Sequence, residues 1–419
     1  LFVRQCRQQF AVTFRILVSK NTLPFRQDQI ATDETLDELE ALLETAGGFC
    51  TGKILQNRHA PDPHSFIGEG KALEVKMLAE ATEANMIVFD NELSPGNIRA
   101  LEEIIGVTVL DRSALILDIF AQRAKTREGR LQVELAQYQY LLPRLSGMGK
   151  SLSRQGGGIG TRGPGETKLE SDRRHIRERI DRLRGELEQV RQVRAVQRER
   201  RIKNSMPVVA IVGYTNAGKS TLLNQLTGAG IPANNRLFDT LDTTSRALTV
   251  SDTLDVILSD TVGFISKLPH HLVDAFRATL EELEYADLLL HVIDSADENR
   301  EEHIAVVDRL ILQLAKPGTK VLRCYNKADL VEPTDIPIGE DVVAVSAAKG
   351  QGMEALLAAI ERMLGHSRHH IVVTLPYSMG GMVDTLHNNA QVKSVDYTAD
   401  GIEIETIVDE ILYGRLRDY

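Results

Sequence analysis

A glycine-rich pattern between a predicted strand and a predicted helix constrains this chain more than any other feature. The β-branched run at residues 208–212 leads into Gly213-Tyr-Thr-Asn-Ala-Gly218-Lys219-Ser220, which matches G-x-x-x-x-G-K-[ST]. Glycines let backbone N–H groups approach phosphates closely, and the N-terminus of the following helix attracts anions. The alternative is a glycine turn before a helix, which the strand–loop–helix context disfavours. We therefore expect Lys219 to reach the β- and γ-phosphates of a nucleotide and the Ser220 hydroxyl to bind Mg²⁺.

A second motif follows the apolar residues 256–258. Asp260-Thr-Val-Gly263 is a D-x-x-G, in which a carboxylate at a strand end can hold Mg²⁺ through water. The backbone N–H of Gly263 can sense the γ-phosphate. This motif therefore predicts a site that distinguishes triphosphates from diphosphates.

Two later motifs predict which base is bound. Asn326-Lys327-Ala328-Asp329 supplies a carboxylate that can accept hydrogen bonds from guanine N1–H and N2–H₂, a donor pair that adenine lacks. Ser346-Ala347-Ala348 ends another predicted strand, where backbone N–H groups can reach guanine O6. Open α/β sheets bind ligands at the carboxyl ends of their strands. The motifs together predict a site that binds GTP with Mg²⁺ and hydrolyses GTP to GDP.

A polar segment at residues 237–248 lies between the first two motifs. One threonine in it is expected to give its hydroxyl to Mg²⁺ when GTP is bound. By spacing alone, Thr240, Thr243 and Thr244 all compete for this role. Most threonines in such a segment belong to a polar surface loop.

Periodicity divides the 419 residues into four predicted domains, and the predicted fold class is multidomain α/β. They are an N-terminal α/β domain at 1–127, in which residues 1–30 stay unassigned, a helical hairpin at 128–205, a Ras-like P-loop G domain at 206–366, and a small α+β domain at 367–419. The first should contain helices at 35–46 and 94–105 and strands at 86–89 and 108–110. The G domain should contain strands at 208–212, 256–258, 288–293, 320–324 and 342–345. The last should contain a strand at 371–377, a helix near 382–388 and a hairpin turning at 399–401.

Two helical stretches flank a glycine-rich loop. Apolar residues recur at helical spacing before the loop, and after it they form a heptad-like seam of Ile176, Ile180, Leu183, Leu187 and Val190. Two such helices can pair as an antiparallel hairpin. Residues 121–203 hold 21 Lys and Arg against 10 Asp and Glu, a net charge of +11 in a chain whose total is −10. We expect this segment to face a polyanion, and a solvated basic helix is the alternative.

The rest of the composition is that of an ordinary globular protein. Hydrophobic residues make up 42%, and no apolar run is long enough to span a bilayer. We expect neither a signal peptide nor stable membrane insertion. Cys6, Cys50 and Cys324 have no metal-ligand spacing, which fits reduced thiols in the cytoplasm. The basic, partly apolar first residues leave a peripheral place at the membrane as an alternative.

Long segments of the sequence resemble the HflX family of ribosome-associated GTPases. They include FIGEGK (66–71), NELSPGNIRALEE (91–103), DRSALILDIFAQRAKTREGRLQVELAQ (111–137), RQGGGIGTRGPGETKLESDRR (154–174), GYTNAGKST, TLDTTSR and DTVGFISKLPHHLVDAFRATLEE. The resemblance implies binding to the ribosome, chiefly to its large subunit and rRNA, and a part in splitting or recycling ribosomes under stress. It favours Thr240 as the switch threonine. We expect the protein to be a monomer.

Motifs and resemblance together give one set of expected site residues. We expect Lys219, Thr240, Gly263 and Asn216 to act in hydrolysis, and Ser220, Thr240 and, through water, Asp260 to hold the metal. The expected GTP contacts are Gly213, Tyr214, Thr215, Asn216, Ala217, Gly218, Lys219, Ser220, Thr221, Phe238, Asp239, Thr240, Leu241, Asp242, Asp260, Thr261, Val262, Gly263, Asn326, Lys327, Ala328, Asp329, Ser346, Ala347 and Ala348.

Phe264 stands where many GTPases place a glutamine that orients the attacking water. A phenyl ring cannot make that hydrogen bond, so we expect slow intrinsic hydrolysis or another means of placing the water. Asn216, in N-A-G-K-S, is similar to the residue that holds K⁺ in some GTPases. It could instead simply hydrogen-bond the loop.

Two rival functions remain at this stage. FIGEGK could bind ATP phosphates and make the N-terminal domain the motor of an RNA-remodelling ATPase, although a tight turn before a helix explains the same residues. A membrane-linked regulatory switch without an RNA partner is the second rival.

Overall fold

The structure is a computed structural model in which residues 12–20, 33–58, 60–145, 164–203, 206–228, 230, 237–238, 244–252, 254–267, 272, 282–364, 369–399, 401–408 and 410–416 are described. The chain divides into two compact units. Unit 1 comprises Leu1–Leu187, Arg236–Phe238 and Lys267–Phe276. Unit 2 comprises Glu188–Asn235, Asp239–Ser266 and Arg277–Tyr419.

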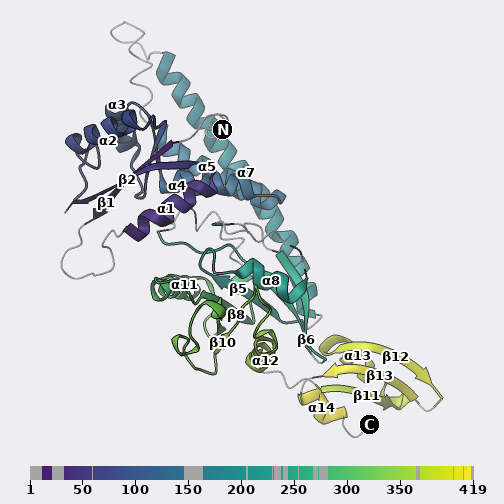
Figure 1. Cartoon of the computed structure of the whole chain (residues 1–419). Coiled ribbons are helices and arrows are strands. Elements are labelled where there is room, and N and C mark those ends of the chain that lie inside the picture. The colour runs from purple at the N-terminus through teal and green to yellow at the C-terminus, as the bar shows by residue number, and fades with distance from the viewer. Residues whose placement is uncertain are drawn as a thin grey trace. The chain divides into compact units, whose positions relative to one another are not determined.

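A parallel four-stranded sheet in the order β2-β1-β3-β4 forms the centre of unit 1 (Figure 1). Its strands are β1 (Val12–Lys20), β2 (Phe49–Arg58), β3 (Met86–Phe89) and β4 (Thr108–Asp111). The last two confirm the strands predicted there. The first 30 residues, which the sequence left in doubt, contribute β1, and this strand lies inside the sheet. Its sequence, VTFRILVSK, is rich in the β-branched and aromatic residues that favour strands.

The helices of unit 1 begin with α1 (Asp33–Thr45), α2 (Glu69–Ala81), α3 (Pro95–Ile105) and α4 (Arg112–Arg123). The helix predicted at 94–105 is confirmed, and its ends have local causes. The Ser94 hydroxyl accepts from the Asn97 N–H, Pro95 occupies the first turn, and Gly106 ends the helix in the left-handed conformation. Apolar side chains of α2 and α3 pack with those of β3 in a buried cluster.

The predicted antiparallel hairpin is confirmed by α5 (Arg127–Arg144) and α7 (Pro164–Lys203). Arg179 Nε lies 2.8 Å from Glu134 Oε1, and Arg127 Nη2 lies 3.7 Å from Glu186 Oε2. The early residue of α5 thus contacts the later residue of α7, as antiparallel helices require. Within the seam Ile180, Leu183 and Leu187 are buried. Arg154 and Arg162 of the connecting loop lie outside the described residues.

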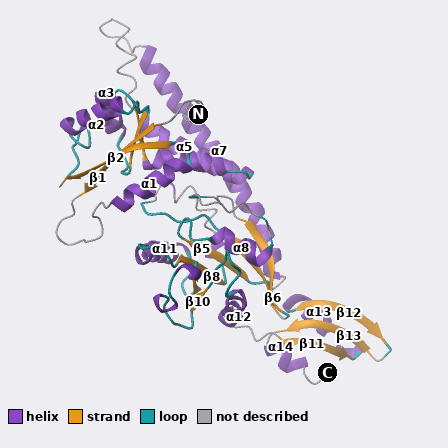
Figure 2. Ribbon diagram, viewed as in Figure 1, coloured by secondary structure: helices purple, strands orange, loops and turns teal. Residues whose placement is uncertain are grey.

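Unit 2 contains a six-stranded sheet in the order β10-β9-β8-β5-β7-β6, in which only β6 runs antiparallel to its neighbour (Figure 2). Its strands are β5 (Val208–Gly213), β6 (Thr244–Ser251), β7 (Leu254–Asp260), β8 (Leu288–Asp294), β9 (Lys320–Asn326) and β10 (Val342–Ala344). The five strands predicted for the G domain are thereby confirmed, with ends that differ by up to two residues.

Helices cover both faces of this sheet. Side chains of α8 (Lys219–Thr227) and α12 (Met353–Leu364) join one buried cluster with Leu288, Leu290 and Val292 of β8. The alternate residue Ile293 instead packs with Ile304 of α11 (Arg300–Leu314). The near-continuous apolar run of β8 follows from this burial on both faces.

The C-terminal part of unit 2 is an antiparallel three-stranded sheet in the order β11-β13-β12. Its elements are β11 (His369–Leu375), α13 (Gly380–Asn389), β12 (Gln391–Thr398), β13 (Gly401–Val408) and α14 (Glu410–Leu416). They confirm the predicted strand, helix and hairpin. No described helix is both long and apolar enough to cross a bilayer. The boundaries of the four predicted domains stay a prediction.

A buried ion pair follows the carboxyl ends of β3 and β4 in unit 1. Arg112, which is 2% exposed, places Nη1 2.7 Å from Asp90 Oδ1 and Nη2 2.6 Å from Glu38 Oε2. Lys267 also contacts Asp90. Burial opposes ionisation of Asp90, but Arg112 and Lys267 outweigh it and hold the pKa of that carboxyl below its ordinary value.

Replacing Arg112 with methionine should destabilise unit 1 by about 3–5 kcal/mol, because it leaves the buried Asp90 carboxylate with only one of its two cations, Lys267. Hydrogen exchange of β3 and β4 amides measures the effect. The matched control is Lys53→Met, which removes a partly exposed pairing with Asp37 and Glu40 and should cost no more than about 1 kcal/mol. Equal losses of protection in the two variants would contradict the prediction.

Candidate functional site

The loop from Gly213 to Gly218 requires glycine at both ends because other groups approach closely. A Cβ on Gly213 would lie 2.3 Å from the Val292 carbonyl oxygen, and one on Gly218 would lie 2.1 Å from Asn326 Nδ2. Gly218 caps the N-terminus of α8 in the left-handed conformation. Asn216 is also left-handed, with φ 63°, and its side chain is exposed. The loop thus has the strand–loop–helix geometry that the motif predicts.

Lys219 is 7% exposed and folds back over this loop. Its Nζ donates to the carbonyl oxygens of Gly213 at 3.1 Å and Tyr214 at 2.8 Å. Burial lowers the pKa of Lys219 to about 8, and the Asp260 carboxylate opposes that shift. A cation in this position suits an anionic ligand, which would restore the stabilisation that burial removes.

Ser220 and Asp260 place two oxygen donors side by side. Ser220 Oγ donates to Asp260 Oδ2 at 3.3 Å, and Asp260 is completely buried at the end of β7. Hard cations such as Mg²⁺ prefer hydroxyl and carboxylate oxygens, so this pair fits the predicted metal. When bound, Mg²⁺ would neutralise charge on the phosphates.

The D-x-x-G segment is hydrogen-bonded to the phosphate-binding loop. The Phe264 N–H donates to the Gly213 carbonyl at 3.1 Å, and the Thr215 N–H donates to the Phe264 carbonyl at 2.7 Å. A Cβ on Gly263 would lie 3.0 Å from Lys219 Nζ. The Phe264 side chain is 2% exposed, and its phenyl ring has no group that could hydrogen-bond water.

Asn326 joins the two base-recognition motifs to the phosphate-binding loop. Its Nδ2 donates to the Ala217 carbonyl at 2.9 Å, and its Oδ1 accepts from the Ala347 N–H at 3.0 Å. Lys327, with φ 59°, places Nζ 2.5 Å from Asp294 Oδ2. The structure therefore brings together the predicted loops that follow β5, β9 and β10.

Asp329 stays ionised at this edge. Hydrogen bonds from the Ser346 hydroxyl and then from Lys349, whose Nζ lies 3.1 Å away, hold the pKa of the Asp329 carboxyl below its ordinary value. An ionised carboxylate only accepts hydrogen bonds, as recognition of a guanine edge requires.

Part of the predicted set is not found in this cluster. Asp239, Thr240, Leu241 and Asp242 lie outside the described residues. Phe238 belongs to unit 1, where its ring packs edge-on against Phe120 with centroids 4.8 Å apart. Their roles in GTP binding stay predictions.

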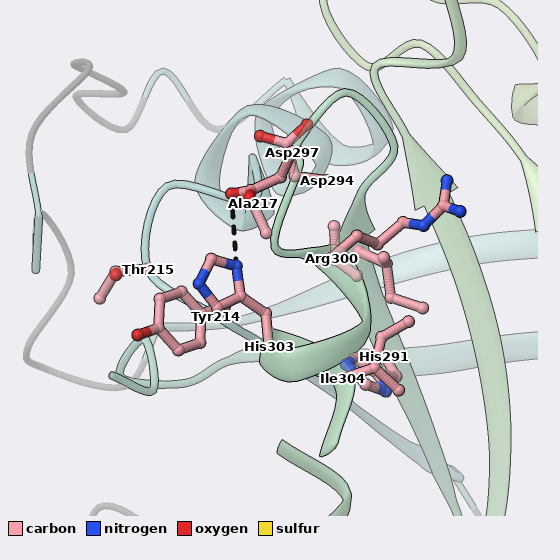
Figure 3. A pocket seen from close by; sticks show the side chains of 11 residues that line it. Tyr214, Thr215, Ala217, His291, Asp294, Asp297, Arg300, His303 and Ile304 are labelled. Carbon is pink, nitrogen blue, oxygen red and sulfur yellow. Dashed lines mark ion pairs between the residues drawn. The ribbon is translucent and has the colours of Figure 1, made fainter. Parts of the chain in front are cut away.

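A small pocket beside the loop contains residues that the sequence analysis did not name (Figure 3). The Tyr214 ring stacks on His303 of α11, and His303 Nδ1 lies 3.3 Å from Asp297 Oδ2. His303 holds the pKa of Asp297 below its ordinary value. In the sequence, this pocket is indicated by Asp294 and Asp297, two carboxylates at and just after the carboxyl end of the predicted strand that becomes β8. Thr215 Oγ1 is buried there without a hydrogen-bond partner among the described residues.

Replacing Asp329 with asparagine should weaken GTP binding about 100-fold, because the amide cannot accept both guanine hydrogen bonds. Affinity for XTP should rise, since the amide can donate to xanthine O2. Competition binding with GTP, ATP and XTP tests this. The control is Asp335→Asn, an exposed position in the same region. A variant that prefers GTP as strongly as the parent would refute the role of Asp329.

Sequence families match the chain over most of its length. Residues 33–121 match GTP-binding GTPase N-terminal, residues 123–201 match GTP-binding GTPase Middle Region, and residues 208–327 match 50S ribosome-binding GTPase. A solved structure described as the complex of SsGBP and GDP is 27% identical with a TM-score of 0.48, covering 84% of this chain and 98% of that one.

Curated relatives are closer. The GTPase HflX of Caldanaerobacter subterraneus subsp. tengcongensis is 48% identical over 92% of this chain and 90% of that protein. The GTPase HflX of Escherichia coli K12 is 46% identical over 83% of this chain and 82% of that protein. The chain belongs to the HflX family of GTPases, and it binds GTP and hydrolyses it to GDP.

Proposed function

We propose that this GTPase binds the ribosome, chiefly the large subunit and its rRNA, and uses its nucleotide state to split or recycle ribosomes under stress. The exposed arginines of α7 carry the proposal. Arg174, Arg177, Arg182 and Arg184 all expose their side chains on this helix. Arginine pairs well with phosphate, and each phosphate contact releases counterions. The description of the family matched by residues 208–327, which names the 50S ribosome, supports the same partner.

The predicted roles of the site residues are part of this proposal. Lys219 exchanges its two carbonyl acceptors for β- and γ-phosphate oxygens. Ser220, Thr240 and, through water, Asp260 would hold Mg²⁺, which GTPases of this kind generally use and which would neutralise charge on the phosphates. Asp329 accepts from guanine, and the backbone of residues 346–348 contacts O6. Asn326 supports both regions because it bonds to both Ala217 and Ala347.

Hydrolysis in the isolated protein should be slow because Phe264 is buried and cannot orient water. We propose that a monovalent cation, K⁺, held with the help of the Asn216 side chain, supplies part of the missing charge stabilisation. Asn216 is exposed, and the oxygen of an amide side chain is a suitable ligand for such a cation. The ribosome would provide the further acceleration.

Exchanging K⁺ for Na⁺ should slow GTP hydrolysis about tenfold or more, because the cation would do part of the electrostatic work of an arginine finger. Asn216→Gly keeps a residue that tolerates the left-handed backbone and should turn over equally slowly in both salts. Phosphate release at matched ionic strength measures both proteins. Equal rates for the parent in K⁺ and Na⁺ would remove the cation from the mechanism.

Replacing Arg174 and Arg177 together by alanine should weaken sedimentation with ribosomes. It should also reduce the slope of log affinity against log salt by about two, one unit for each lost phosphate contact. The matched control is Arg309→Ala with Lys316→Ala, two exposed cations on or next to α11. GTP binding should be unchanged in both.

An unchanged salt slope in the α7 variant would make that helix a spacer. Arg154→Ala with Arg162→Ala tests the glycine-rich loop in the same way. Binding to liposomes but not to ribosomes at matched salt would favour the membrane-linked switch. ATP hydrolysis that persists in Asp329→Asn would favour the RNA-remodelling ATPase.

A further inference from the structure

Tyr214, the second residue of the phosphate-binding loop, is held on two sides. Its ring stacks on the His303 imidazole with centroids 3.7 Å apart and planes 11° apart (Figure 3). Its hydroxyl donates to Ser266 Oγ at 2.8 Å and accepts from the Ser266 N–H at 2.7 Å. Tyr214 is 7% exposed, so water competes little for these bonds.

Ser266 lies three residues after Gly263, so the Tyr214 hydroxyl acts directly on the segment that follows the D-x-x-G motif. The backbones of Gly213 and Thr215 already bond to Phe264 on the same side. The two bonds to Ser266 extend this attachment past Phe264. Together they fix the ends of the short stretch that follows Gly263.

There is little free space around the Cα atom of Gly263. A Cβ there would lie 3.0 Å from both Lys219 Nζ and Thr215 Cγ2. A small displacement of the segment would therefore change the distance between the Gly263 N–H and the groups around Lys219. Gly263 has no side chain whose packing could hold this segment in place. The position of its N–H is therefore restrained by the hydrogen bonds of the residues that follow it.

The pair of His303 and Asp297 holds the ring that carries this hydroxyl. His303 is anchored by its contact with Asp297, 3.3 Å from Nδ1 to Oδ2, and its face limits movement of the Tyr214 ring. Phenylalanine at position 214 would keep this stack while losing both hydrogen bonds. The hydroxyl and the ring can therefore be tested separately.

We propose that Tyr214 is a positioning residue for GTP hydrolysis, whose hydroxyl fixes Ser266 and so holds the Gly263 N–H at the place of the γ-phosphate. This inference rests on the proposed assignment of Gly263 to that phosphate. GDP lacks the γ-phosphate, so its binding does not depend on the Tyr214 hydroxyl. Loss of the hydroxyl should consequently weaken binding of GTP and leave the affinity for GDP nearly unchanged.

The test compares Tyr214→Phe with the parent full-length chain. The rate constant kcat and the affinity for a non-hydrolysable GTP analogue should each fall about tenfold, as expected for the loss of two hydrogen bonds of modest net strength. Affinity for GDP should change by less than about twofold, well below the factor that one such bond represents. Ser266→Ala should act in the same direction and more weakly, because the Ser266 N–H still reaches Tyr214. Ser266→Thr keeps a hydroxyl at this position, so its kcat and its nucleotide affinities should equal those of the parent chain.

Tyr377→Phe is the matched control, because it also removes a hydroxyl that hydrogen-bonds, here to the Thr398 carbonyl at 2.6 Å in the C-terminal sheet region. It should leave both nucleotide affinities and kcat unchanged. Equal weakening of GDP and the GTP analogue in Tyr214→Phe would show that the tyrosine only supports the loop, and would overturn the proposal. Unchanged kcat and affinities would overturn it too.

Gly263→Ala tests separately whether the Gly263 N–H senses the γ-phosphate, which is the assignment on which the role of Tyr214 rests. If that variant loses the preference for the GTP analogue over GDP while Tyr214→Phe keeps it, Gly263 senses the γ-phosphate and Tyr214 does not position it. If Gly263→Ala retains the preference, the assignment of Gly263 is itself wrong and the positioning role falls with it.

Discussion

One buried carboxamide joins the loops on which the nucleotide site depends. Asn326 is 3% exposed, and it donates to the phosphate-binding loop while it accepts from the turn at Ala347. An amide offers a donor and an acceptor on one rigid plane, which neither a carboxylate nor an apolar side chain can do. The closeness of Gly218 to Nδ2 shows how little room this arrangement leaves. The base-recognition loops and the phosphate-binding loop therefore keep a fixed spacing.

On the phosphate side of the site, backbone hydrogen bonds take the place of a single bridging side chain such as Asn326. There the loop after β5 pairs with the segment after β7 through two backbone bonds to Phe264, and side-chain oxygens of Tyr214 and Ser266 continue the contact. Backbone pairing alone ends at Phe264. This contrast is consistent with a site whose base-binding half is rigid and whose γ-phosphate half depends on a few side chains.

Sequence reasoning succeeded where spacing along the chain determines spatial neighbours. The strand–loop–helix at Gly213 and the seam of α7 are of this kind, because local periodicity fixes them. It left β1 out although the residues of β1 favour a strand, and its place between β2 and β3 depends on long-range pairing. It also missed His303, because the stack with Tyr214 joins residues 89 positions apart in a way that only the packing of α11 determines.

The resting place of Lys219 affects how a ligand can enter the site. Its ammonium is already out of water and hydrogen-bonded to two backbone carbonyls. The free energy of dehydrating this cation is therefore spent when the chain folds and is not required again at the moment of association. An arriving phosphate must still lose its own water, but at Lys219 it replaces two backbone carbonyls and no hydration shell. Capture of an anion at this lysine is thus an exchange of hydrogen-bond acceptors by an ammonium group that is already buried.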